Sequence, residues 1–436
     1  MRIGLFILAG LTFAQTPTIS LEDALTRAKQ HGGQIQSANL AALLAQEDRA
    51  QARAATLPSL SALNQFIYTE GNGTPSGVFV ANDGVHVYNE QAVVHEELLS
   101  LVRHGETRRA MAAEAVAKAK VEVAARGLSS TVIQDYYAIV AAQRKFGNAK
   151  TSLKEAERFF DLTQKQEKGG EVAHADVIKA QIDLQQRQRD VKEADLAIEK
   201  ARIALGILIF PNFSSDFAVV DDLAEIVELP TVDGNAAAAS SPDIRAAVAG
   251  VQEAGWEVSV ARYQFLPSFG LDFFYGIDAN QFAANTSGPT DASGRSTLPN
   301  YQVNGRQNLG YSAQVTMTVP VWNWGATRSK VKQAELKRDQ AQLDLSLAQR
   351  TLQSNLAAAY AESRASRGQL DSLHSSVDLA TESLRLTVLR YQAGEATALE
   401  VVDAQNTVTL ARNAYDDGLA RYRIALSNLK VLTGSL

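Results

Sequence analysis

Two carboxylates near the C-terminal end of the chain, Glu400 and Asp403, have a spacing that favours a chemical role. They lie three positions apart, so they share one face if this segment is helical. Glu400 also has a purely structural interpretation, because Thr397 and Glu400 have the spacing of a capping box that begins a helix. The sequence leaves both interpretations open.

The histidines do not favour a metal centre. His86, His95 and His104 recur at intervals of nine, which places successive side chains on alternate faces of a strand and does not bring them together. The sequence has no Gly-rich phosphate loop, no Ser-His-Asp signature and no His-Glu-x-x-His motif. It has no cysteine, which excludes disulfides and thiolate metal sites. We therefore predict no enzymatic activity, no cofactor and no bound metal.

The composition favours long helices over a compact globule. Aromatic residues make up only 7% of the chain, while Ala, Gln, Leu and Val crowd long stretches. The net charge is −6, and the charged residues are dispersed, which argues against nucleic acid as a partner.

The N-terminus has the layout of a secretory signal. Arg2 precedes an almost wholly apolar run from Ile3 to Phe13, and we predict cleavage after Ala14. A buried N-terminal helix is the alternative. No cysteine follows that could carry a lipid anchor. No later stretch approaches the roughly 18 consecutive apolar residues of a membrane-spanning helix. If the protein enters a membrane, it must do so as strands.

Groups of residues in the first half recur in the same order in the second half, about 210 to 225 positions later. The clearest pairs are Leu57-Pro58-Ser59 with Leu266-Pro267-Ser268, and Gly170-Glu171 with Gly394-Glu395. Such a period indicates an internal duplication. We predict a signal peptide at 1–14, a first structural repeat at 15–235 and a second at 236–436.

Each repeat is predicted to contain a helix, two strands and two long helices. The predicted ranges are 20–56, 60–70, 87–100, 105–168 and 173–209, then 241–263, 268–278, 308–321, 325–392 and 397–433. Apolar residues spaced by three and four, such as Leu153, Ala156 and Phe160, indicate coiled-coil packing of the long helices. A helical bundle without a pore would show the same periodicity, so that alternative stays open.

The predicted strand 308–321 alternates strictly, since every second side chain from Leu309 to Val319 is apolar. This pattern is typical of a strand between lipid and water, although a soluble sheet packed on helices would share it. Four strands cannot close a barrel, and an open edge cannot face lipid. A membrane sheet would therefore require oligomerisation, and three chains would supply a wall of about 12 strands.

Nearly the whole chain after the signal resembles the TolC-type outer-membrane efflux proteins. The resemblance rests on the two Leu-Pro-Ser triplets, on the segment Val319-Pro320-Val321-Trp322-Asn323-Trp324-Gly325 and on the hairpin from Tyr391 to Gln405. It implies a mainly α fold with β, built from duplicated strand hairpins and long coiled-coil helix hairpins. Three such chains would trimerise into a β-barrel of about 12 strands, which continues as an α-helical barrel. An equatorial belt would lie near 210–240 and the C-terminal end.

The resemblance also implies the function. The homotrimer would be the exit duct of a tripartite efflux pump or type I secretion system, opened by an inner-membrane pump and a periplasmic adaptor protein. It would be a passive conduit in the outer membrane of a Gram-negative-type bacterium, in contact with lipid, with its helical part in the periplasm and no lipid anchor. The alternatives are a periplasmic coiled-coil adaptor, which would lack the duplicated strand pair, and a soluble helical scaffold.

The resemblance assigns roles to residues at the ends of the helical hairpins. Glu400 and Asp403 match the family's acidic gate, where three chains would present roughly six carboxylates. Tyr391 and Asp176 match contacts of the closed state. Ala396 stands where the best-studied member has arginine, so we expect the link between neighbouring hairpins to be weaker or to use other residues, such as Lys179 or Arg390. The tip turns and adaptor contacts would be Gly169, Gly170, Glu171, Gly394 and Glu395.

Overall fold

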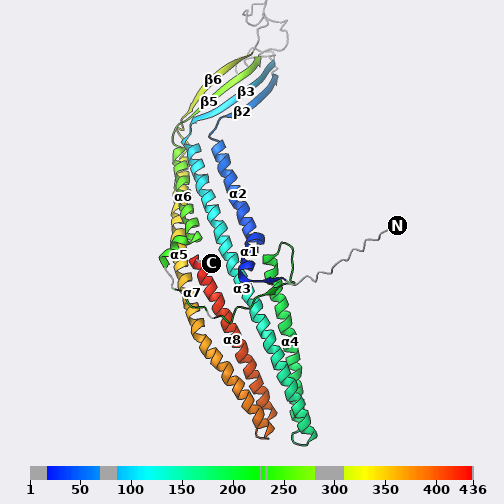
Figure 1. Cartoon of the computed structure of the whole chain (residues 1–436). Coiled ribbons are helices and arrows are strands. Elements are labelled where there is room, and N and C mark those ends of the chain that lie inside the picture. Colours follow the sequence, from blue (N-terminus) through cyan, green and yellow to red (C-terminus); the bar gives the residue numbers. More distant parts are fainter. Residues whose placement is uncertain (1–16, 69–85, 226, 231–233, 280–308, 435–436) are drawn as a thin grey trace, which may run out of the picture. The chain divides into compact units, whose positions relative to one another are not determined.

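The computed structural model describes residues 17–68, 86–225, 227–230, 234–279 and 309–434. The predicted signal peptide lies outside the described residues. The N-terminal half contains β1 (Thr18–Ile19), α1 (Leu21–His31), α2 (Gly33–Ala54), β2 (Ser59–Tyr68), β3 (His86–Leu99), α3 (Leu101–Lys168), α4 (His174–Ile209) and β4 (Ala218–Val219) (Figure 1). The C-terminal half contains α5 (Gly234–Ser240), α6 (Pro242–Tyr263), β5 (Ser268–Ala279), β6 (Leu309–Thr318), α7 (Ala326–Gln392) and α8 (Ala398–Thr433). The predicted mainly helical fold with some sheet is confirmed.

The prediction of one continuous helix over 20–56 is wrong. Gly32 separates α1 from α2, with φ −62° and ψ 117°, and its N–H caps α1 by donating to the carbonyl of Ala28. A Cβ at Gly32 would lie 2.5 Å from Cδ2 of Leu128 in α3. The glycine therefore allows α3 to approach at the break. Periodicity did not reveal the break, because helical spacing continues on both sides of it.

The predicted strand 308–321 also extends too far, because β6 ends at Thr318. Pro320 has no N–H to donate to a ladder, which explains why pairing stops there. Three short elements, β1, β4 and α5, were not predicted. β4 and α5 lie within the range 210–240, where the resemblance places an equatorial belt.

The described chain forms two compact units. One unit comprises the described residues within Met1–Ala42, Ala117–Ala246 and Leu345–Leu436, and the other comprises those within Leu43–Val116 and Ala247–Asp344. We call the first the helical unit and the second the sheet unit. Within the described residues of both units, no helix is apolar over a length that could cross a bilayer.

The sheet unit contains one four-stranded sheet with the order β2-β3-β5-β6, and all neighbours are antiparallel. Its register gives the two faces opposite character. One row across the sheet is Leu60, Val94, Phe273 and Ala313, and the next row is Ser59, His95, Asp272 and Gln314. Successive rows point to opposite faces, so these two rows lie on opposite sides of the sheet. The separation is incomplete, because Glu96 pairs with Leu271 on the apolar side and Val93 pairs with Phe274 on the polar side. In the described strands, β2 and β6 are open edges.

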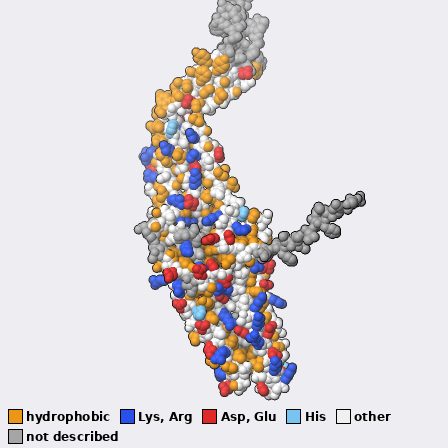
Figure 2. Space-filling model, viewed as in Figure 1, with side chains coloured by type: hydrophobic (Ala, Val, Ile, Leu, Met, Phe, Trp, Pro, Cys, Tyr) orange, Lys and Arg blue, Asp and Glu red, His pale blue; other side chains and the backbone are white. Residues whose placement is uncertain are grey.

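The apolar side of the sheet is exposed in the single chain. Tyr311 is 78% exposed and Val315 is 65% exposed, and the Tyr311 ring stacks on Phe273 with 6.1 Å between ring centroids. Figure 2 shows hydrophobic side chains gathered over the strands. Apolar area of this kind normally needs a lipid or protein partner.

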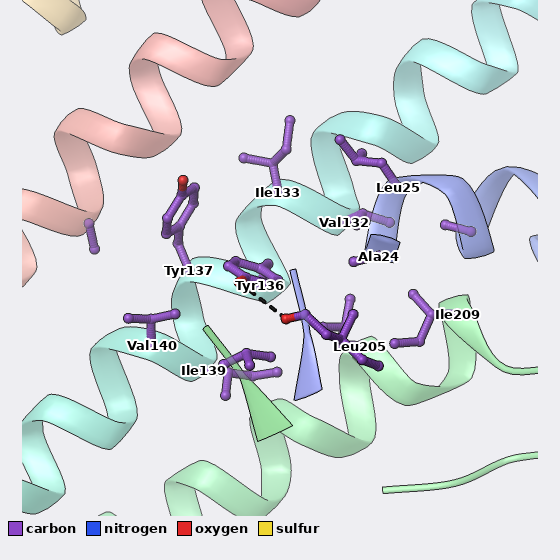
Figure 3. Packing of buried hydrophobic residues seen from close by; sticks show 14 of the residues in the cluster. Ala24, Leu25, Val132, Ile133, Tyr136, Tyr137, Ile139, Val140, Leu205 and Ile209 are labelled. Carbon is purple, nitrogen blue, oxygen red and sulfur yellow. Dashed lines mark hydrogen bonds between the residues drawn. The ribbon is translucent and has the colours of Figure 1, made fainter. Parts of the chain in front are cut away.

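The helical unit has its main core where α1, α3, α4 and the β1–β4 pair meet (Figure 3). Tyr136 and Tyr137 of α3 are both 1% exposed, and their rings pack edge to face. The Tyr136 hydroxyl donates to the carbonyls of Val220 at 2.8 Å and Ile19 at 3.4 Å. Burial raises the pKa of Tyr136 to about 12. These contacts attach the short strand pair to α3.

A charged link fastens the same region. Arg144 of α3 binds the Asp221 carboxylate with two nitrogens, at 2.7 and 2.9 Å, and reaches Asp416 of α8 at 3.2 Å. Asn148 donates to the other oxygen of Asp416 at 2.8 Å. One arginine thus joins the segment after β4 to two long helices. Bidentate arginine–carboxylate pairs are the strong, directional form of this interaction.

Candidate functional site at the hairpin tips

The first tip is the turn between α3 and α4. Gly170 has φ 75°, and the N–H of Glu171 donates to the carbonyl of Gln166 at 2.9 Å. The left-handed conformation costs a glycine little, and the turn closes with the hydrogen bonds of a helix C-cap. Gly169 and Glu171 are exposed beside it.

The second tip, between α7 and α8, repeats this geometry. Gly394 has φ 77°, and the N–H of Glu395 donates to the carbonyl of Arg390 at 2.8 Å. Glu395 is exposed. Both predicted glycine turns are therefore present where the sequence placed them, and their predicted contact with an adaptor stays a prediction.

Glu400 has the capping role that the sequence allowed. Its carboxylate Oε1 accepts from the N–H of Thr397 at 3.2 Å, and its own N–H donates to the Thr397 hydroxyl at 3.3 Å. Arg390 lies on its other side, with Nη1 3.6 Å from Oε2 of Glu400, and donates through Nη2 to the carbonyl of Glu395 at 3.1 Å. The Glu400 charge is thus partly compensated inside its own hairpin.

Asp403 is different, although it lies one turn further along α8. Its side chain is exposed, and within the described residues no ion pair or hydrogen bond holds its carboxylate. Glu400 is also exposed, so both carboxylates remain accessible to solvent and to ions. Of the two, Asp403 carries the charge that the chain does not compensate.

Tyr391 lies in the interior of the tip. It is 3% exposed, and its ring packs edge to face on Phe159 of α3 with 5.1 Å between centroids. Burial raises the pKa of Tyr391 and the Asp176 carboxylate acts in the same direction, whereas the nearby Thr163 side chain lowers it. Its hydroxyl makes no hydrogen bond to any residue the structure describes. The contact of this tyrosine in the single chain is therefore apolar packing rather than a hydrogen bond to Asp176.

The apolar cluster around Tyr391 joins the two hairpins. It includes residues of all four long helices, namely Phe159, Ala180, Ala380, Leu384, Tyr391, Ala398, Val401, Val402 and Val408. The helix pairs are thus in contact through side chains at their tips. Lys179 is exposed on α4 and is not part of this cluster.

Sequence reasoning missed two contributors to the tip. Phe159 was not singled out, although the apolar spacing of α3 includes the neighbouring Phe160. The pairing of Arg390 with Glu400 was also missed, because Arg390 was expected to contact a neighbouring hairpin. Ten positions separate the two residues across a glycine turn, and such a turn brings the helix ends together.

The histidines stay apart. His95 lies on the polar face of the sheet with Nδ1 2.6 Å from Oδ1 of Asp272, and Nδ1 of His104 lies 3.0 Å from the carbonyl of Ser100. The His86 side chain lies outside what the structure describes. Across the described ranges no group of three or more His, Asp or Glu side chains is arranged to hold a metal.

Comparison with known proteins finds outer-membrane proteins among the matches. Residues 234–435, just under half of the chain, match the family model described as outer membrane efflux protein. OprJ, an outer membrane protein of Pseudomonas aeruginosa, is 28% identical over 188 residues, which are 43% of this chain and 36% of OprJ. AprF, the alkaline protease secretion protein of the same organism, is 21% identical over 433 residues, which are 96% of this chain and 85% of AprF.

Solved structures share the fold. The CmeC outer membrane channel of Campylobacter jejuni superposes with a TM-score of 0.80 at 19% identity, covering 95% of this chain and 85% of CmeC. VceC, an outer membrane protein of Vibrio cholerae, superposes with a TM-score of 0.79 at 17% identity, covering 95% of this chain and 96% of VceC. At these identities the likeness establishes the fold alone.

The four-stranded sheet and the paired helical hairpins are thus the fold of outer-membrane channel proteins. The resemblance to the TolC-type outer-membrane efflux proteins is confirmed by the family model, by the relatives and by the fold.

Proposed function

We propose that this chain is one protomer of a trimeric outer-membrane efflux duct. It would serve a tripartite efflux pump or a type I secretion system, with a periplasmic adaptor and an inner-membrane pump as partners. The duct would be a passive conduit without enzymatic activity.

The single observation that carries the proposal is the sheet, with one apolar face exposed and both edges open. An unpaired edge cannot lie in lipid, because its N–H and C=O groups would have no partner there. Pairing β6 of one copy with β2 of the next satisfies both edges at once. Three copies would give a closed barrel of about 12 strands, with the apolar face toward lipid and the polar face toward the lumen.

The same assembly would bring the hairpin tips around one axis. Asp403 would then supply the principal charge of an acidic ring, and Glu400 would contribute less because Arg390 lies 3.6 Å from it. Tyr391, Asp176 and Lys179 would lie between or within hairpins and influence whether the tips stay closed. Gly169, Gly170, Glu171, Gly394 and Glu395 would present the tips to the adaptor.

The remaining expectations belong to the same proposal. Residues 1–14 would be removed on export, and 15–235 and 236–436 would be duplicated repeats. The mature protein would lie in the outer membrane, with the helical unit in the periplasm and no lipid anchor.

Membrane fractionation of producing cells tests the proposal. The protein should sediment with the outer membrane, and after extraction in mild detergent its mass should be that of three chains. A monomer in the soluble periplasmic fraction would instead favour an adaptor or a helical scaffold.

A further inference from the structure

A cavity of about 430 Å³ lies in the sheet unit, between the C-terminal turns of α2 and the first turns of α3. Most of its lining side chains are basic or hydroxylic. The lining comprises Arg49, Arg53, Thr56, His104, Thr107, Arg108 and Met111. The side chains of three arginines and one histidine thus line one hollow, and no carboxylate is among its lining residues.

Part of this lining is fixed by the fold. Arg49 binds the carboxylate of Glu114 at 2.9 Å, and that side chain is only 6% exposed. The Thr107 hydroxyl donates to the carbonyl of Ala52 at 3.1 Å, which joins α3 to α2 beside the cavity. These contacts fix α2 and α3 relative to each other on either side of the cavity.

Two of the guanidinium groups are uncompensated. Arg53 and Arg108 are exposed, and neither forms an ion pair with any residue that the structure describes. The charge of Arg49 is already offset by Glu114. The cavity therefore has two spare positive charges on opposite helices, which suits an anion with several oxygen acceptors.

The place of the cavity in the sheet unit narrows the choice of anion. α2 leads directly into β2, and β3 leads directly into α3. The cavity therefore lies just beyond the end of the sheet whose apolar face is exposed. Figure 2 shows Lys and Arg side chains on the helix ends next to the hydrophobic strands. Lipid phosphates lie at this level, immediately outside the hydrocarbon layer.

We propose that this cavity binds the phosphate of an anionic phospholipid headgroup. The inference rests on the proposed function, because it takes the sheet to lie in a membrane. Arg53 and Arg108 would each donate in the forked geometry that suits phosphate oxygens. Met111, 43% exposed, offers an apolar contact for the part of the lipid next to the headgroup.

The test measures binding of short-chain phosphatidylglycerol, below its micelle concentration, to the full chain in neutral detergent. The variant Arg53→Gln/Arg108→Gln should bind about 10 to 30 times more weakly than the wild type, since each basic residue near an anionic headgroup contributes on the order of a few-fold to tenfold. The control Arg328→Gln/Lys332→Gln removes the same charge from exposed positions of α7 outside the cavity and should bind within about twofold of the wild type.

Two further arms distinguish the source of the phosphate. Inorganic phosphate and short-chain phosphatidylethanolamine should bind much more weakly than phosphatidylglycerol. Inorganic phosphate binding as tightly as the lipid would contradict a lipid site. Equal binding of phosphatidylglycerol by the wild type and by Arg53→Gln/Arg108→Gln would overturn the inference.

This experiment also separates the inference from the proposed function, because the short-chain lipid is soluble and binding needs no membrane insertion. A protein that failed to reach the outer membrane but bound the lipid through Arg53 and Arg108 would contradict the proposed function and support the site. If the protein formed an outer-membrane trimer but Arg53→Gln/Arg108→Gln bound the lipid as tightly as the wild type, the result would support the proposed function and contradict the site.

Discussion

Two exposed carboxylates on one face of α8 differ in what surrounds them. Glu400 accepts from Thr397 and lies 3.6 Å from Arg390, whereas Asp403 has no such compensation within the described chain. An exposed ion pair of this kind contributes little to stability, but it reduces the field that Glu400 projects outward. The two residues should therefore respond differently to substitution.

The first prediction concerns this pair. Asp403→Ala should remove most of the cation preference of the duct and most of its block by divalent cations, because clustered carboxylate oxygens are what such cations bind. Glu400→Ala should change selectivity less and should cost about 1 kcal/mol of local stability through loss of the cap. Reversal potentials in a salt gradient measure the selectivity. Equal loss of selectivity in both variants would show that Arg390 does not offset Glu400.

The second prediction concerns Tyr391, which is buried against Phe159 with an unpaired hydroxyl. Tyr391→Phe should leave the stability of the tip within about 1 kcal/mol of the wild type, since it removes no hydrogen bond. Tyr391→Ala should cost about 3 to 5 kcal/mol and should raise conductance by loosening the contact between hairpins.

Native-state hydrogen exchange over 386–402 reports the local opening free energy of this tip for both variants. A large destabilisation by Tyr391→Phe would indicate that the hydroxyl has a partner in the assembly, as a closed-state contact through the hydroxyl requires.

Among the helices and turns, the sequence predicted those features that depend on residues close together in the chain. The glycine turns at Gly170 and Gly394 and the Thr397–Glu400 box were recognisable, because each depends on residues within one turn of chain. The break at Gly32 was missed, although the dipeptide Gly32-Gly33 is a local signal for the end of a helix. The Arg144 link to Asp221 and Asp416 could not be predicted in this way, since it joins residues far apart in sequence.

The third prediction tests a tip turn. Gly394 has φ 77°, and a Cβ there would meet no atom within 4 Å, so a substitution would change only the backbone preference. Gly394→Ala should therefore destabilise the turn by about 1 to 2 kcal/mol, and Gly394→Asn should cost less. The matched control is Gly368→Ala within α7, which has the same open surroundings but no positive φ. It should be neutral or stabilising by hydrogen exchange. Equal destabilisation in both variants would contradict the strained-turn argument.

At the scale of the whole molecule, the sheet decides how copies assemble. In one chain β2 and β6 are separated by β3 and β5, so they lie about 14 Å apart across the sheet. Alternation in β6 predicted an apolar face, but the order of the four strands could not be read from the sequence, since it depends on pairing between distant segments.

The fourth prediction uses the absence of native cysteine. Cysteine pairs with one member on β2 and one on β6, scanned around Ser61 and Ser312, should form disulfides between chains and trap a covalent trimer. The control Val93→Cys/Phe274→Cys lies on directly paired residues of β3 and β5 and should give only an intrachain disulfide. Non-reducing electrophoresis distinguishes the products. Absence of any interchain product from every β2–β6 pair would exclude the proposed closure of the barrel.

Conductance in planar bilayers tests the central claim most directly. Detergent-purified wild-type protein should insert and give discrete conductance steps, should prefer cations, and should be blocked by divalent cations added on the side of the hairpin tips only. A correctly folded trimer that inserted without conducting, or that conducted without cation preference and without one-sided block, would contradict a duct with an acidic gate at its tips.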